Sequence, residues 1–256
     1  MIEKGTNLIG EIRNNNFGTK MKIIAYRKHS DIDVQFMDEY GYVVHNTTYT
    51  NFRKEQIKNP YDPTTYNKGY IGVGKYMAKT EGKVVDSYNT WHDMIRRCYS
   101  VKSKDKFSAY YHICTVSKLW HNYQNFAEWF DKNKYPVEGR LHIDKDILYP
   151  GNKMYNPETC LLVPQRINML FVNLPNRYGL PNGIRPTNSN RFSAMYNGKS
   201  LGVYDTLEES YAIYSREKER VIQEIANEYK EIIPSKLYDA LMEYRVRIDI
   251  DKNWVA

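Results

Sequence analysis

Residues 141–146 alternate side chains suited to proton transfer or metal binding with apolar or basic ones. Successive side chains of a β-strand point to opposite faces, so a strand here places His142, Asp144 and Asp146 on one face. The other face then carries Leu141, Ile143 and Lys145. Two carboxylates with a nearby amide oxygen suit Mg²⁺, and a histidine with a pKa of ~6.5 suits a general base.

The residues that follow predict how this strand is continued. Pro150 and Gly151 indicate a turn, which brings the amide of Asn152 near the carboxylates, and a short return strand is expected next. Asn156 is a good helix N-cap and Pro157 suits the first helical position. The expected order is strand, turn, strand and helix, with the helix running to about residue 170.

Five spaced motifs over residues 85–172 carry a family resemblance. They are Trp91-x-x-Met94-x-x-Arg97-Cys98-Tyr99, Trp120-His121-Asn122-Tyr123-Gln124-Asn125-Phe126, Asp144-Lys145-Asp146, Gly151-Asn152-Lys153-x-Tyr155-x-Pro157-Glu158-x-Cys160, and Asn168. Together they resemble the HNH (ββα-metal) nucleases of phages and mobile introns. The resemblance implies metal-assisted hydrolysis of DNA, with Asp144 as a metal ligand. We expect one Mg²⁺ or Mn²⁺ ion, held by Asp144 with Asp146 or Asn152.

Lys145 departs from the family pattern, because it stands where the family has its histidine base. A lysine with a pKa of ~10.4 is a poor base at neutral pH, but it can contact a scissile phosphate. His142, on the same face as Asp144, is the substitute base. The expected catalytic set is therefore His142, Asp144 and Lys145. The alternative is that catalysis has been lost and the carboxylates only pair with neighbouring cations.

The segment before this motif predicts aromatic-rich helices. Apolar residues recur at helical spacing over residues 87–99, and a second helix is expected from near Asn122. We expect their aromatic rings to form a core and not a base-stacking surface. Basic side chains in this part of the chain are candidates for contacts with the DNA backbone: Arg96, Arg97, Lys102, Lys104 and Lys106. Lys153, which follows the motif, is a further expected DNA-binding residue.

The C-terminal segment predicts a sheet followed by helices. Residues 191–196 and 199–204 are expected strands around Asn197-Gly198, a strong signal for a type I′ hairpin turn. Thr206 and Glu209 form a capping box at the start of a long helix. A final helix is expected after Pro234.

This pattern, with a short strand near 183–186, resembles the three-stranded DNA-binding domain of plant ethylene-response factors (ERF), which also occurs in phage homing nucleases. The elements are Gly-Ile-Arg, Arg-Phe-Ser-Ala, Asn-Gly-Lys and Leu-Gly-x-Tyr-Asp-Thr-x-Glu-Glu within residues 183–230. The resemblance implies that the exposed sheet face lies in the major groove. The expected DNA-binding residues are Arg185, Arg191, Ser193 and Lys199. Alternatively, the sheet serves packing alone.

The N-terminal segment predicts a small β domain. Period-two alternation indicates strands over residues 20–23 and 31–36, and further strands are expected at 41–45 and 48–52. The domain either docks on DNA or is a plain β domain with a solvated edge.

Charge placement supports nucleic acid as the partner. The 256 residues carry 37 Lys and Arg against 30 Asp and Glu, a net charge of +7, and residues 73–177 hold 16 basic against 10 acidic side chains. Three cysteines at no ligand-like spacing argue against a disulfide scaffold, and no apolar run is long enough to span a membrane.

We therefore expect an α+β, multi-module protein of the host cytoplasm. Breaker-rich segments at 60–83 and 173–186 separate a β module (1–72), an HNH-like module (73–177) and an ERF-type module (178–256). The expected partner is double-stranded DNA, with no membrane and no small-molecule cofactor. The function is a site-specific homing endonuclease or a non-catalytic DNA-binding regulator or anti-defence protein. A protein-binding module that uses its Tyr-rich surface is a third interpretation.

Overall fold

The computed structural model describes residues 8–172, 176–251 and 253–254. It confirms an α+β fold, with helices and several small sheets. The chain divides into two compact units, one of residues 1–111 with 118–127 and the other of residues 112–117 with 128–256. The middle segment expected at 73–177 contributes to both units. Of the breaker-rich stretch at 173–186, residues 173–175 lie outside the described residues.

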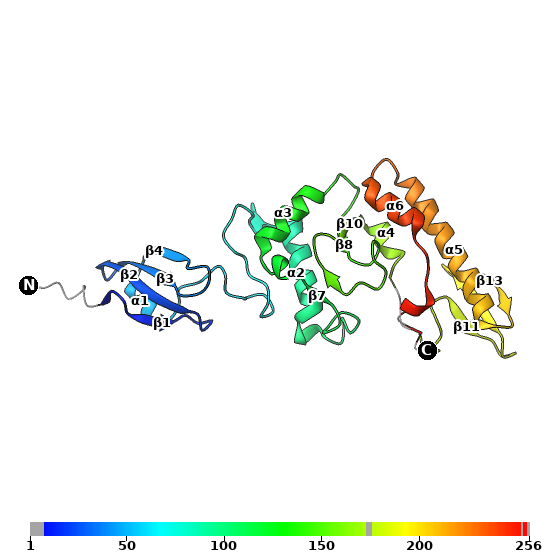
Figure 1. Cartoon of the computed structure of the whole chain (residues 1–256), viewed down its shortest axis with the longest axis horizontal. Helices are drawn as coiled ribbons and strands as arrows, with labels where there is room; N and C mark the ends of the chain where they lie inside the picture. The colour runs from blue at the N-terminus through cyan, green and yellow to red at the C-terminus, as the bar shows by residue number, and fades with distance from the viewer. Residues whose placement is uncertain (1–7, 173–175, 252, 255–256) are drawn as a thin grey trace, which may run out of the picture. The chain divides into compact units, whose positions relative to one another are not determined.

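The first unit begins with a four-stranded antiparallel sheet in the order β1-β2-β3-β4 (Figure 1). Its strands are β1 (Ile12–Asn14), β2 (Lys20–Lys28), β3 (Asp31–Phe36) and β4 (Val43–Thr47). The predicted alternation is confirmed, because Met21, Ile23, Ile32, Val34 and Phe36 are buried on one face. These apolar side chains form the core of the domain together with Phe52.

The strand expected at 48–52 is wrong, because this segment forms helix α1 (Tyr49–Arg53). Thr48 caps the helix, and its hydroxyl accepts a hydrogen bond from the backbone N–H of Asn51 at 3.0 Å. The cap satisfies a backbone donor that would otherwise be free, and the turn of helix carries Phe52 into the core.

Aromatic side chains build a second core in the first unit. It lies around α2 (Asp86–Tyr99), the 3₁₀ turn η3 (Lys118–His121) and the beginning of α3 (Tyr123–Asn133). Trp91 and Trp120 are fully buried, and the indole N–H of Trp91 donates to the carbonyl of Trp120 at 2.8 Å. The expectation that these rings form a core is confirmed. Shorter elements complete this region: β5 (Lys79–Thr80), β6 (Lys83–Val84) and η2 (Val101–Ser103).

The second unit contains the strand-strand-helix order, but later in the sequence than expected. β8 (Leu141–Asp144) pairs antiparallel with β10 (Leu161–Pro164), and α4 (Gln165–Met169) follows. The predicted return strand is β9 (Met154–Tyr155), which pairs in parallel with β7 (Thr115–Val116) and not with β8.

The helix expected from Asn156 to about residue 170 is also wrong. The side-chain oxygen of Asn156 accepts the backbone N–H groups of Glu158 and Thr159, both at 2.9 Å, and closes a turn. An asparagine that suits a helix N-cap suits this turn equally, since both use the same side-chain acceptor. Buried Leu162 and Val163 then extend the chain as a strand.

The C-terminal elements agree with the sequence pattern. β11 (Ile184–Pro186), β12 (Phe192–Tyr196) and β13 (Lys199–Tyr204) form an antiparallel sheet, with α5 (Leu207–Glu228) lying beside it (Figure 1). Asn197 and Gly198 both have positive φ, as the predicted turn requires. The Thr206 hydroxyl accepts the backbone N–H of Glu209 at 3.2 Å. The remaining elements are α6 (Ser235–Glu243) and η4 (Ile248–Ile250).

One apolar core joins β10 and α4 to the C-terminal helices within this unit. Val163 and Ile167 pack with Ile222 of α5 and Leu237 of α6, all of them buried. Segments that the sequence assigned to two modules thus share a core. Among the described residues, no helix is both long and apolar enough to cross a membrane.

Candidate functional site

Burial alternates along β8 and the two residues after it. Leu141, Ile143 and Lys145 are buried, whereas His142, Asp144 and Asp146 keep partial exposure. The predicted division between two faces therefore holds for residues 141–144, which form β8. It does not hold for Asp146, because this residue lies beyond the strand and its carboxylate contacts Lys145, which was expected on the opposite face. Beyond Asp144 the chain leaves the strand and enters a loop that returns at Asn152.

Asp144 holds the beginning of this loop. Its Oδ1 accepts hydrogen bonds from the backbone N–H groups of Asp146 at 2.8 Å and Ile147 at 2.7 Å. Burial raises the pKa of Asp144 to about 6, and the nearby carboxylate of Asp146 adds to the rise. The two N–H donors act in the opposite direction, because they favour the charged form. Asp144 therefore titrates closer to neutral pH than an ordinary aspartate.

Lys145 is only 4% exposed, and its ammonium group contacts three oxygen atoms. Nζ lies 2.7 and 2.8 Å from the two carboxylate oxygens of Asp146 and 2.5 Å from the backbone carbonyl of Asn152. Lys145 lies on the buried side with Leu141 and Ile143, as expected, but its ammonium group forms an ion pair with the neighbouring Asp146.

Asn152 closes the loop from the other side. Its Nδ2 group donates to the carbonyls of Lys145 and Met154, both at 2.9 Å, and its Oδ1 accepts the backbone N–H of Met154. The amide is thus engaged in building the turn. The structure brings Asp144, Lys145, Asp146 and Asn152 together in one loop.

These contacts bear on the metal ion that the sequence predicts. Among the described residues, no three or more His, Cys, Asp or Glu side chains form a group that could hold a metal ion. An ion at Asp146 would have to displace the ammonium of Lys145 or lie beside it against charge repulsion. While Lys145 occupies this position, the donor set does not fit a divalent ion, and we derive no catalytic step through one.

A buried lysine that the sequence interpretation missed lies near this loop. Lys218 of α5 is 8% exposed and lines a cavity of about 80 Å³ together with Asp146 and Asp251. Burial lowers the pKa of Lys218, and Asp251 partly offsets this effect. A sequence signal was present, because Lys218 lies four residues after Tyr214 and four before Ile222, on the apolar face that helical spacing predicts for α5.

The outward face of the C-terminal sheet carries the predicted DNA contacts. Arg185, Ser193 and Val203 lie directly opposite one another on three adjacent strands, so they share a face. Arg185 is exposed, and no hydrogen bond or ion pair involves its side chain within the described parts of the chain. On the other face, buried Ala194 packs against Tyr211 and Tyr214 of α5.

The structure separates the other two basic candidates from Arg185. The Nε of Arg191 lies 2.6 Å from the Oδ1 of Asp205, so Arg191 is paired at the end of the sheet. Lys199 lies opposite Tyr196, on the side that faces α5. The hydrogen bond from Arg220 lowers the pKa of Glu217 on that helix, and the charge of Lys199 adds a smaller effect.

A hollow of about 710 Å³ lies beside β11 and the hairpin turn. Arg185 lines it together with Arg177, Tyr178 and Asn182, which the sequence interpretation did not single out. Arg177 is exposed and donates to the hydroxyl of Tyr178 at 3.0 Å. The basic character of Arg177 was visible in the sequence, but its breaker-rich surroundings indicated only a loop.

Asn182 positions the beginning of β11. Its side-chain and backbone N–H groups donate to the carboxylate of Asp251 at 2.9–3.0 Å. These contacts tie the segment before Arg185 to the C-terminal end of the chain. A partner 69 residues away leaves no local sequence signal.

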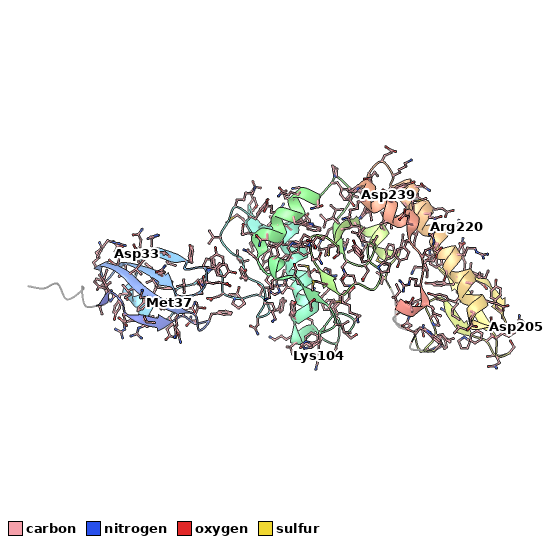
Figure 2. All side chains as sticks on the ribbon, in the orientation of Figure 1. Asp33, Met37, Lys104, Asp205, Arg220 and Asp239 are labelled. Atoms are coloured by element: carbon pink, nitrogen blue, oxygen red, sulfur yellow. The ribbon has the colours of Figure 1, made fainter. Side chains whose placement is uncertain are left out.

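The basic candidates outside the sheet lie in different surroundings. The guanidinium of Arg96 lies 5.4 Å from the ring centroid of Phe107 and pairs with Asp93, and that of Arg97 lies 5.8 Å from Tyr110. Both arginines are therefore partly covered. Lys104, labelled in Figure 2, and Lys153 are exposed.

Comparisons of the chain with models of protein families, with curated proteins and with solved structures each find no match. The arguments for function therefore come from the geometry alone.

Proposed function

We propose that this chain binds double-stranded DNA in the host cytoplasm through the outward face of the sheet formed by β11, β12 and β13. The main observation that supports this proposal is the position of Arg185. Its side chain is exposed on this face and borders the hollow that Arg177 also lines. A narrow sheet of this kind fits the major groove, where an arginine can contact guanine O6 and N7 with two hydrogen bonds. Ser193, directly opposite Arg185, is a second candidate for base contacts.

The other basic candidates suit contacts with phosphate groups. Arg191 can exchange its partner Asp205 for a phosphate, because both present oxygen acceptors to a guanidinium. Lys199 at the hairpin turn and Lys153 are exposed, and Arg96 and Arg97 present partly covered guanidinium groups. Such contacts orient a protein on DNA without specifying sequence.

DNA hydrolysis is the second candidate function. Asp144, with its raised pKa, and His142, two residues earlier on β8, are the groups that support it. The ion pair between Lys145 and Asp146 favours instead the non-catalytic alternative, a DNA-binding regulator or anti-defence protein. Hydrolysis would require Mg²⁺ or Mn²⁺ to enter the loop despite this pair.

Selection from a library of random duplexes tests the binding proposal. We expect the full chain to enrich a defined sequence, and its affinity to fall steeply between ~50 and ~200 mM salt because phosphate contacts release counterions. Absence of any complex at the low salt concentration would contradict the proposal.

Incubation of phage genomic DNA with the chain and Mg²⁺ or Mn²⁺ tests hydrolysis separately. Cleavage that Asp144→Ala abolishes would establish the nuclease. Intact DNA under conditions where the chain binds would favour the non-catalytic alternative.

A further inference from the structure

The loop between β8 and β9 contains a positive charge that is buried within the protein. Lys145 is 4% exposed, although an ammonium group is costly to bury unless oxygen atoms surround it. Three oxygens do so here, two from the carboxylate of Asp146 and one from the carbonyl of Asn152, at 2.5–2.8 Å. An ammonium has three N–H donors, so this set can satisfy all of them.

The contacts run in both directions between the two ends of the loop. Lys145 donates to the carbonyl of Asn152, and the amide of Asn152 donates back to the carbonyl of Lys145 at 2.9 Å. The ring of Tyr155, itself buried, has its centroid 5.8 Å from Nζ and adds a further favourable surface for the cation. The ammonium therefore lies at the centre of the loop's hydrogen bonds.

Carboxylate and backbone carbonyl oxygens are also the ligands that hard divalent cations prefer. We infer that Lys145 supplies, from within the chain, the positive charge that a divalent metal ion would otherwise supply to this loop. The loop is then ordered without a metal ion. This inference stands on the contacts of Lys145 and does not depend on the proposed DNA binding.

Thermal unfolding of the full chain tests whether the loop needs a metal ion. We expect the midpoint of the wild-type protein to be the same with EDTA and with millimolar Mg²⁺ or Mn²⁺. A saturable rise with either ion that Asp146→Asn abolishes would overturn the inference. This arm needs only the wild-type protein and a conservative variant.

Substitution of Lys145 tests whether its charge is what the loop requires. Lys145→Ala and the similarly sized, neutral Lys145→Met should both lower the midpoint, by roughly 5 °C, since each leaves the three oxygens without their donor. Lys132→Ala is the matched control, because the Lys132 side chain is 69% exposed and its pairing with Glu128 should matter little. A Lys145→Met variant as stable as the wild type would overturn the inference.

Chemical rescue distinguishes lost charge from lost packing. The n-propylammonium ion reproduces the part of the side chain that Lys145→Ala removes. We expect it to raise the midpoint of Lys145→Ala and to leave Lys132→Ala unchanged, while n-propanol has no such effect. Equal rescue by n-propanol would show that packing, and not charge, was lost, and would contradict the inference. If the Lys145 variants do not fold, the unfolding midpoints of the wild-type protein with EDTA and with Mg²⁺ or Mn²⁺ still test the inference.

Discussion

Arg191 and Asp205 form an ion pair at the end of the C-terminal sheet, with Nε and Oδ1 2.6 Å apart. Arg191 precedes β12 and Asp205 follows β13, so the pair joins the outer ends of the hairpin strands. Figure 2 labels Asp205 at this end of the sheet. The carboxylate of Asp205 pairs with the guanidinium that the sequence predicts as a DNA contact, so the pair should oppose the proposed DNA binding until a phosphate replaces it.

Asp205→Asn should strengthen DNA binding. The change removes one negative charge and frees Arg191, and we expect the dissociation constant to fall by a factor of roughly 3–10 at low salt. Fluorescence anisotropy with a labelled duplex measures it. Asp239→Asn, an exposed position on α6, makes the same change in net charge. Equal effects of the two substitutions would show that the Arg191 pair has no special role.

Arg185→Ala should weaken DNA binding by roughly 5- to 150-fold, because an arginine that contacts a base pair contributes roughly 1–3 kcal/mol of discrimination. Arg220→Ala is the control, since Arg220 lies on α5 and pairs with Glu217 and Glu224. The enriched sequence should also become less defined for Arg185→Ala alone. Loss of affinity by the same factor in both variants would argue against direct contact by Arg185.

Gly183→Ala should destabilise the C-terminal sheet. Gly183 has a φ of +79°, and an added Cβ would lie 2.1 Å from the ring of Tyr214. We expect a loss of about 2 kcal/mol in the free energy of unfolding, measured by urea denaturation. Gly179→Ala is the control, because Gly179 also has positive φ but has no atom within 4 Å of an added Cβ. A similar loss in both variants would show that backbone strain alone is responsible.

Asp144→Asn should change how stability depends on pH. The pKa of Asp144 is raised to about 6 in the folded protein, above its ordinary value of 3.8, so the folded state binds this proton more tightly. This group therefore lowers the stability of the wild type as pH rises from about 4 to about 6.

The neutral amide of the Asp144→Asn variant lacks this penalty and can still accept both N–H groups. Relative to the wild type, the variant should thus gain about 2 kcal/mol between pH 4 and pH 7. Urea denaturation at both pH values measures the gain, with Asp239→Asn as the control. A difference that does not vary with pH would contradict the raised pKa.

Cys98, Cys114 and Cys160 should resist alkylation in the folded protein. All three are free thiols and buried, and burial raises the pKa of Cys160 to about 12. Because the thiolate is the reacting form, we expect almost no modification by iodoacetamide at pH 8 in native buffer and complete modification in urea. Mass spectrometry counts the added groups. Rapid modification of Cys160 in native buffer would contradict this prediction, because it would show that the segment around Cys160 opens.

The hairpin, its turn and the capped helix α5 follow from the sequence alone. Asn197-Gly198 needs no distant partner to adopt positive φ, and the Thr206 hydroxyl finds its donor three residues away. The same is true of the alternating core of β2 and β3 and of the aromatic face of α2. In each case the determining interactions are local or repeat with the period of the element.

Tertiary structure determined the conformation of segments whose residues suit two different local structures. Asn156 can cap a helix or close a turn, and the turn forms because Leu162 and Val163 are buried in β10. Thr48 likewise ends the sheet by capping α1, which places Phe52 in the core.

Sequence and tertiary structure likewise determined different features of the candidate site. The sequence by itself determined that His142 and Asp144 share a face, because both lie on β8 and the period of a strand is two. Only the tertiary structure decided that Lys145 turns back to Asp146 and that Arg191 meets Asp205. Such ion pairs depend on how a loop or the end of a hairpin closes, and local spacing does not encode that geometry.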